Sequence, residues 1–151
     1  MSKCKFGVHE IEYLGHIISG NGVQTNVAKT IAMVQWPVPK TLKSLRGFLG
    51  LIDYYRKFIR GYGSIGAPLT ELLMKKSFCW SDKAVSAFEL LKAVVSNPPV
   101  FTLPDFTKVF TIECDASGVG LGVVLMQDSQ PIAFYSKAFK GKELLLSTYE
   151  K

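Results

Sequence analysis

The spacing of the apolar residues changes once along this chain, and that change limits the folds available to it. Between residues 42 and 59, apolar side chains recur at steps of three and four, the spacing of one helix face. They are Leu42, Leu45, Leu49, Ile52, Tyr55 and Ile59. After residue 108 they form three short strand-like runs instead, at 109–115, 118–127 and 131–139. Short connections between these runs favour an antiparallel meander, so the pattern predicts an α+β chain with helices before a sheet.

The other expected elements are shorter and are separated by turn-forming or helix-stopping residues. They are an N-terminal hairpin with strands at 3–8 and 11–19 joined by His9 and Glu10, helices at 26–35, 69–76 and 82–96, a loop at 61–68, and a helix starting at 141. Thr25 or Asn26, Thr41 and Ser81 precede helical patterns, and their side-chain oxygens suit them as N-caps. Residues 103–108, LPDFTK, are expected to form an exposed tether at a domain boundary, with Asp105 in a turn.

The positive charge of the chain lies in its first half. The formal net charge is +6, and residues 1–76 hold eleven Lys or Arg against four Asp or Glu. Residues 77–151 hold seven against eight. This imbalance favours a polyanion-binding first half, although lysines solvated on an ordinary surface would give the same count.

Nothing in the sequence indicates a membrane or a secreted protein. The longest mostly apolar run, Val119–Met126, is far shorter than the about 20 residues that cross a bilayer. No apolar signal region follows Met1, and the three cysteines are far apart in the sequence. The expectation is an intracellular protein with reduced thiols, either cytoplasmic or nuclear.

The polar side of the long helical pattern carries a possible binding ridge. Arg46, Gly50 and Tyr54 are four residues apart and therefore share one face. The flanking cations are Lys43, Lys57 and Arg60, with Asp53 as the one acid. A glycine inside a helix costs up to about 1 kcal/mol relative to alanine, so Gly50 needs a reason. One reason is close approach of a duplex minor groove, and the other is close packing against a second helix of this chain.

Asp115 stands at the end of an apolar strand and is followed by three glycines in seven residues. It could be a metal ligand, part of a nucleotide-binding loop, or a solvated strand end. The segment GVGLG lacks the G-x-G-x-x-G spacing and leads into a strand, which argues against a nucleotide loop. Glu113 would share a face with Asp115 on an alternating strand, which makes it a weaker candidate for the same site.

Ten short stretches, in order along the chain, resemble one known family. They are YLGHIIS (13–19), WPVP (36–39), LRGFLGLIDYYRKFI (45–59), APLTELL (67–73), FCW (78–80), AFELLK (87–92), LPDF (103–106), CDAS (114–117), PIAFYSKAF (131–139) and STYEK (147–151). Together they resemble the pol polyprotein of gypsy-type LTR retrotransposons, where the C-terminal end of reverse transcriptase runs into ribonuclease H. The resemblance implies four parts: a palm end at 1–23, a thumb-like helical region at 24–76, a connection at 77–108, and the first half of a ribonuclease H-like domain at 109–151.

The resemblance also implies roles for residues in the first half. Tyr13, Leu14, Gly15 and His16 match the primer grip, the hairpin that holds the primer 3′ end. The helix at 42–59 matches the first thumb helix, whose face at Arg46, Gly50 and Tyr54 would lie in the minor groove, with Lys43 and Lys57 nearby for phosphates. The implied partners are an RNA–DNA hybrid or a DNA duplex and the remainder of a pol polyprotein.

For the second half, the resemblance makes Asp115 the first catalytic carboxylate of ribonuclease H and a ligand of Mg²⁺. The intact site uses two metal ions roughly 4 Å apart, held by several carboxylates. Glu150 matches the exposed neighbour of the second carboxylate, and no adjacent Asp-Asp pair for a polymerase site occurs in the sequence. The expectation is a truncated, catalytically inactive fragment that holds no stable Mg²⁺. The alternatives are a host-retained nucleic-acid-binding module and an interaction domain.

Overall fold

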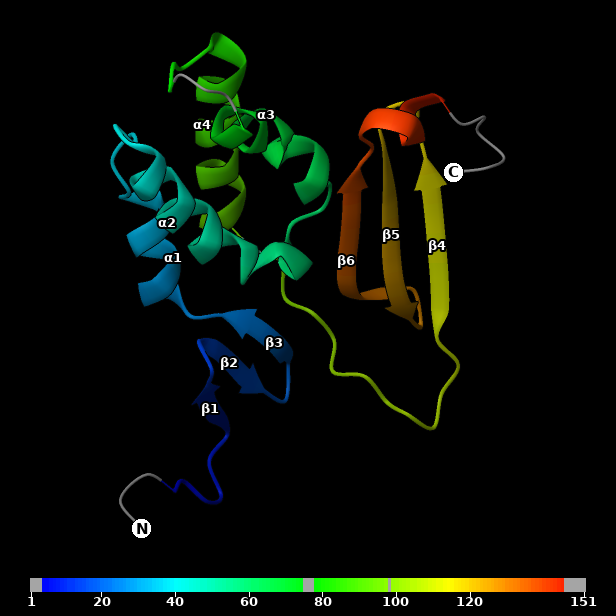
Figure 1. Ribbon diagram of the computed structural model, residues 1–151. Helices are drawn as coiled ribbons and strands as arrows, with labels where there is room; N and C mark the ends of the chain where they lie inside the picture. Colours follow the sequence, from blue (N-terminus) through cyan, green and yellow to red (C-terminus); the bar gives the residue numbers. More distant parts are fainter. Residues whose placement is uncertain (1–3, 75–77, 98, 146–151) are drawn as a thin grey trace.

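The computed structural model describes residues 4–74, 78–97 and 99–145, which form two small sheets flanking a group of helices (Figure 1). The helix that was expected to continue after residue 145, and Glu150 within it, lie outside the described residues. The α+β class is confirmed, with strands first, helices next and an antiparallel meander last. Among the described residues, no helix is long and apolar enough to span a membrane.

The N-terminal sheet is a three-stranded antiparallel meander rather than a hairpin of two long strands. Its strands are β1 (Glu10–Tyr13), β2 (His16–Ser19) and β3 (Gly22–Thr25). The expected turn at His9 and Glu10 is wrong, because the chain reverses at Leu14 and Gly15, whose φ angles are +49° and +75°. Positive φ at both central residues is the signature of a two-residue hairpin turn. Tyr13 therefore pairs with His16 across this turn, which is called the β1–β2 turn below.

Three helices begin at the expected capping residues. Asn26 caps α1 (Val27–Val34), Thr41 caps α2 (Leu42–Asp53) and Ser81 caps α4 (Asp82–Ser96), each by accepting a bond from a backbone N–H. The pattern at 42–59 predicted one continuous helix, but α2 ends at Asp53. The chain then turns through Tyr54 and Tyr55 into the 3-10 helix η1 (Arg56–Phe58), so the two tyrosines stand at a bend.

The loop expected at 61–68 is a helix. α3 (Tyr62–Met74) starts after Gly61, whose φ is +72°, and continues through Pro68. Gly63 explains the misassignment, since a Cβ there would lie 3.0 Å from the Ser136 backbone in the C-terminal sheet. The glycine that suggested a loop permits close packing of α3 against that sheet, and tertiary contact overrides low local propensity.

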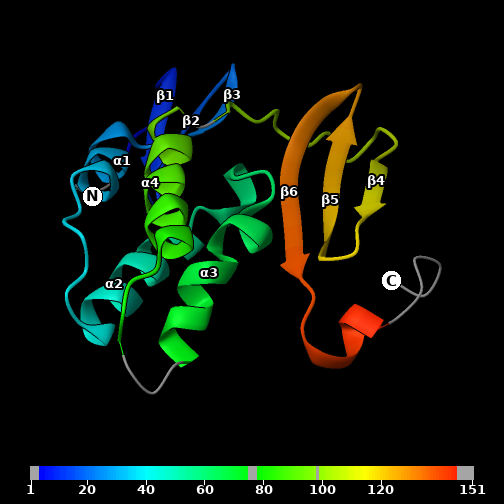
Figure 2. The same cartoon turned by 90° about the horizontal axis from the view of Figure 1, so that it is seen from above.

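The C-terminal sheet is the antiparallel meander β4 (Thr111–Ala116), β5 (Gly120–Gln127) and β6 (Gln130–Ala138), close to the predicted bounds. β6 runs beside α3, and the Gly63 N–H donates to Ser136 Oγ at 2.7 Å (Figure 2). β4 lies at the far edge and is exposed along almost its whole length, with Ile112 64% exposed. Of the helix expected after the sheet, the described part is the 3-10 turn η2 (Gly141–Leu145).

A row of aromatic rings joins the two sheets through the helices. Phe58 of η1 stacks on Phe101 with ring centroids 4.7 Å apart, and Phe101 meets Phe134 of β6 edge-on at 5.3 Å. Phe101 is 2% exposed and its backbone bridges Val23 of β3. The chain is therefore anchored at Phe101 immediately before the exposed tether. Within the tether Asp105 forms the expected turn, accepting from the Thr107 N–H and hydroxyl.

Candidate nucleic-acid interface

α2 separates its residues cleanly into a buried face and an exposed face. Leu45, Phe48 and Ile52 are fully buried in the core. Arg46 and Gly50 are exposed on the opposite side, and Tyr54 at the C-cap is 49% exposed. Tyr54 keeps helical backbone angles, so the expected alignment of these three residues survives the early end of the helix. We call the surface of Arg46, Gly50 and Tyr54 the α2 strip.

Gly50 has open space around it. A Cβ built on this residue meets no atom of the described chain within 4 Å. Close packing of α2 against another described helix is therefore not the reason for the glycine, and that alternative is wrong. The absent side chain leaves the backbone of α2 accessible from outside, between an arginine and a tyrosine.

Two exposed cations accompany Arg46 of the α2 strip, Lys43 from α2 and Lys57 from η1. Arg60, the third cation expected here, is also exposed but lines a pocket beside β4 instead. Asp53, at the end of α2, forms an exposed i,i+3 ion pair with Arg56 at 3.5 Å. Exposed pairs of this kind contribute little, so the surface keeps a positive character suited to phosphate groups.

The β1–β2 turn lies directly against the end of α2. The Tyr54 hydroxyl donates to the Leu14 carbonyl at 2.5 Å, and the Tyr55 hydroxyl donates to the Gly15 carbonyl at 3.2 Å. Gly15 must be glycine here, because a Cβ would lie 2.8 Å from the Tyr55 hydroxyl oxygen. The structure thus brings Leu14 beside Tyr54 and Gly15 beside Tyr55, although 40 positions separate the members of each pair in sequence.

His16 fills the space behind the turn. Its ring stacks on Tyr54 at 5.5 Å and 10°, and contacts Tyr55 edge-on and Phe58 at a tilt. His16 is buried, whereas Tyr13 and Leu14 are 59% and 67% exposed. Of the four residues predicted for the primer grip, the exposed ones are therefore the first two, and His16 supports them from inside.

Burial lowers the pKa of His16 from its ordinary value of 6.5, and the nearby charge of Lys57 lowers it further. Among the described residues, its Nδ1 has no hydrogen-bond partner that would stabilise a proton there. Because the folded pKa is depressed, the unfolded chain takes up the proton first as the pH falls. The stability that neutral His16 provides is therefore present above about pH 6.5 and is lost as the pH falls toward the folded pKa.

We expect the free energy of unfolding to drop as the pH falls below about 6.5, the histidine pKa in unfolded chains, toward the lower pKa of folded His16. The His16→Phe substitution should flatten this dependence, because it removes the titrating imidazole and keeps an aromatic ring at the stacked position. Urea unfolding curves at several pH values measure both. Equal pH dependence in the wild type and the His16→Phe chain would contradict the assignment.

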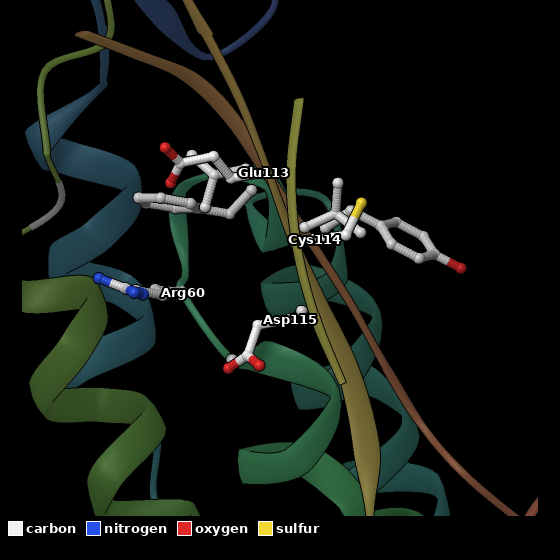
Figure 3. Close-up of a pocket in the computed structure, with 10 residues that line it drawn as sticks. Arg60, Glu113, Cys114 and Asp115 are labelled. Carbon is white, nitrogen blue, oxygen red and sulfur yellow. The ribbon is translucent and has the colours of Figure 1, made fainter. Parts of the chain in front are cut away.

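Asp115 lies at a different place, in a pocket of about 440 Å³ between β4, β5, β6 and the turn at Arg60 and Gly61. Figure 3 shows Glu113 and Asp115 on the same side of β4 as Arg60, with Cys114 on the opposite side, as the alternation of a strand requires. Asp115 is exposed and pairs in register with Gly122. It is therefore accessible to solvent, and it is not part of the α2 surface.

The described residues do not fit a two-metal site around Asp115. No group of three His, Cys, Asp or Glu residues within the described ranges could hold a metal ion. The pocket offers two carboxylates and one guanidinium, whereas two divalent cations close together need several negative ligands. No catalytic step through Mg²⁺ follows from this arrangement, and the metal role of Asp115 stays a prediction.

Tyr55 and Phe58 support the interface from behind through their contacts with Gly15 and His16. The sequence pattern placed Tyr55 only on the apolar face of the helix and did not predict these contacts. Their partners are distant in sequence, so helix periodicity could not reveal them. The adjacent Tyr54 and Tyr55 at the end of an amphipathic pattern were the available signal, since a buried tyrosine hydroxyl usually needs an acceptor.

The chain has relatives among proteins of retrotransposons and of a plant mitochondrion. Residues 80–151 match the RNase H-like domain found in reverse transcriptase. Over its full length the chain is 42% identical to the retrovirus-related Pol polyprotein from transposon 297 of Drosophila melanogaster, of which it spans 14%. It is 54% identical to the uncharacterized mitochondrial protein AtMg00860 of Arabidopsis thaliana, over 72% of this chain and 70% of that protein.

Solved structures share the fold. The foamy viral protease-reverse transcriptase in complex with RNA/DNA hybrid matches with a TM-score of 0.87 at 22% identity, over 94% of this chain and 20% of the other. The same enzyme in complex with dsDNA matches with a TM-score of 0.87, over 95% of this chain and 31% of the other. The sequence matches decide the family: the chain belongs to the retrovirus-related Pol polyproteins of gypsy-type retrotransposons and includes their RNase H-like domain.

Proposed function

We propose that the chain binds a nucleic-acid duplex, either an RNA–DNA hybrid or double-stranded DNA, through the α2 strip and the β1–β2 turn. The observation that carries the proposal is the open backbone at Gly50, between Arg46 and Tyr54 on the exposed face of α2. Because Gly50 has no side chain, the backbone of α2 can approach a ligand closely at this point. Binding in the minor groove of a duplex requires such a close approach. An internal packing role does not account for it.

The charges around the strip support a polyanion as the ligand. Lys43 and Arg46 are exposed on α2, and Lys57 is exposed just beyond its end. Contacts from lysine and arginine to phosphates position a protein on a duplex without reading its sequence. The proposed binding is therefore structure-selective and independent of base sequence.

The relatives are consistent with this proposal. The chain spans 14% of the length of the transposon 297 polyprotein, so the activities of the whole polyprotein do not transfer to it directly. The foamy viral protease-reverse transcriptase, which has the same fold over this region, has been solved with RNA/DNA hybrid and with dsDNA. Of the activities of such a polyprotein, duplex binding is the one that the α2 surface by itself supports.

Salt-dependent binding of a fluorescently labelled RNA–DNA hybrid tests the proposal. On DNA, log affinity falls with log salt concentration with a slope of about −0.9 for each phosphate contact. Arg46→Ala should therefore weaken binding and make this slope less negative by about 1. Lys83→Ala removes another exposed cation, from α4, and serves as the control. A slope near zero in the wild type, or equal losses in the two variants, would contradict the proposal.

We further infer that the 151-residue chain, tested alone, neither polymerises DNA nor cleaves the hybrid. The sequence has no adjacent Asp-Asp pair, and the other charged residues that line the Asp115 pocket within the described ranges are Glu113 and Arg60. Incubation of a labelled hybrid with the chain and Mg²⁺ should leave the RNA intact. Cleavage that is lost on Asp115→Asn would show that the site is active.

A further inference from the structure

The tip of the β1–β2 turn holds a residue in a conformation that its type disfavours. Leu14 has φ +49°, in the left-handed region, while its side chain is 67% exposed. A Cβ makes this region unfavourable, and asparagine or glycine occupies such turn positions more readily. Strained residues of this kind persist where their surroundings hold them, and they are concentrated at binding sites.

The groups that hold this turn come from outside its own sheet. The Leu14 carbonyl accepts from the Tyr54 hydroxyl, and the Gly15 carbonyl accepts from both the Tyr55 hydroxyl and the Asn26 N–H, the latter at 3.1 Å. Tyr54 and Tyr55 stand at the end of α2, and Asn26 begins α1. The helices therefore set the position of the turn.

The two tyrosines are themselves fixed. Their rings meet edge-on at 5.0 Å, and His16 stacks flat on Tyr54 from the turn side. Tyr55 is 3% exposed, while half of Tyr54 faces solvent. The Tyr54 O–H already donates to the Leu14 carbonyl, so its proton is not available to a ligand, whereas its exposed ring is.

We propose that Tyr54 and Tyr55 are positioning residues that clamp the β1–β2 turn to α2, so that Leu14 and the α2 strip meet a duplex as one rigid surface. This inference rests on the duplex binding proposed above and assigns to the two tyrosine hydroxyls the role of holding the turn in place. Leu14 carries no charge and no donor, so its exposed side chain suits the sugar ring of one strand. The phosphates are left to the cations of α2.

Tyr54→Phe is the variant that tests the clamp, because it removes one O–H and keeps the ring. Loss of one hydrogen bond should raise amide hydrogen exchange at residues 13–16 by about fivefold, with hybrid affinity falling by a similar factor. The salt slope should stay unchanged, because no phosphate contact is lost, in contrast to Arg46→Ala. Tyr135→Phe removes a hydroxyl from a half-exposed tyrosine of β6 and should change none of these quantities.

A second substitution separates strain from simple destabilisation. Asparagine tolerates positive φ, so Leu14→Asn added to Tyr54→Phe should restore slow exchange in the turn. It should not restore hybrid affinity, because the apolar side chain is gone. If the double variant exchanges as fast as Tyr54→Phe alone, the clamp does not serve to hold a strained turn and the inference is overturned.

The remaining outcomes are also decisive. If Tyr54→Phe lowers affinity while exchange at residues 13–16 is unchanged, the Tyr54 hydroxyl acts on the ligand itself rather than through the turn, and the positioning role is wrong. If neither quantity changes, the clamp has no function. If the wild-type chain binds no hybrid, the proposed duplex binding fails, and the exchange measurements still decide whether the tyrosines hold the turn.

Discussion

Replacing Phe58→Ala is expected to cost about 3–5 kcal/mol of stability, a large part of the 5–15 kcal/mol typical of a domain. Phe58 is 2% exposed and lies where the parts of the fold meet. It stacks on Phe101 and contacts His16, and through Phe101 it connects to Phe134 of the C-terminal sheet. Its removal would leave a cavity that neither sheet can fill alone.

Phe106→Ala provides the matched control for this experiment. Phe106 is 84% exposed and its ring meets Phe110 on the surface, so its truncation should change stability by less than about 0.5 kcal/mol. Urea unfolding curves for the two variants measure the difference. Similar midpoints for Phe58→Ala and the wild type would contradict the central place given to Phe58 in this fold.

Replacing Gly50→Leu is expected to separate binding from stability. No described atom obstructs a side chain at this position, and leucine favours a helix over glycine by nearly 1 kcal/mol, so the fold should be retained or slightly stabilised. The same side chain would stand between α2 and a bound duplex. A loss of about 1.4 kcal/mol of binding free energy corresponds to tenfold in affinity, and we expect at least about that loss.

Ser86→Leu adds an equal side chain to an exposed position of α4 and is the control for Gly50→Leu. It should leave hybrid affinity within about twofold of the wild type, as surface substitutions away from an interface do. Fluorescence anisotropy and thermal unfolding of the same samples measure both effects. Unchanged affinity in the Gly50→Leu chain would remove the main reason for placing a duplex on the α2 strip.

The parts of the fold that depend on local signals could be predicted from the sequence. Asn26, Thr41 and Ser81 cap their helices because capping depends on a few neighbouring residues. The three C-terminal strands follow from alternation and short turns. The apolar spacing also separated the buried face of α2 from its exposed face, which is why Arg46, Gly50 and Tyr54 were selected as a group.

The parts that depend on distant contacts could not be predicted. Gly63 suggested a loop because its contact with Ser136 of β6 is invisible in a local pattern. The predicted end of α2 and the predicted position of the first turn were both wrong for the same reason. The Tyr54 and Tyr55 hydroxyls bond to the Leu14 and Gly15 carbonyls across 40 residues, and these bonds fix both the bend and the turn.

Mapping the backbone amides by NMR during titration with an RNA–DNA hybrid tests the central claim most directly. If a duplex lies along α2, the largest shift changes will fall on the exposed positions from Lys43 to Lys57, with Gly50 among them, and on the β1–β2 turn. Amides of the buried face and of α4 will change little. Shift changes centred on the C-terminal sheet, with the α2 amides unmoved, would show that the duplex-binding surface lies elsewhere.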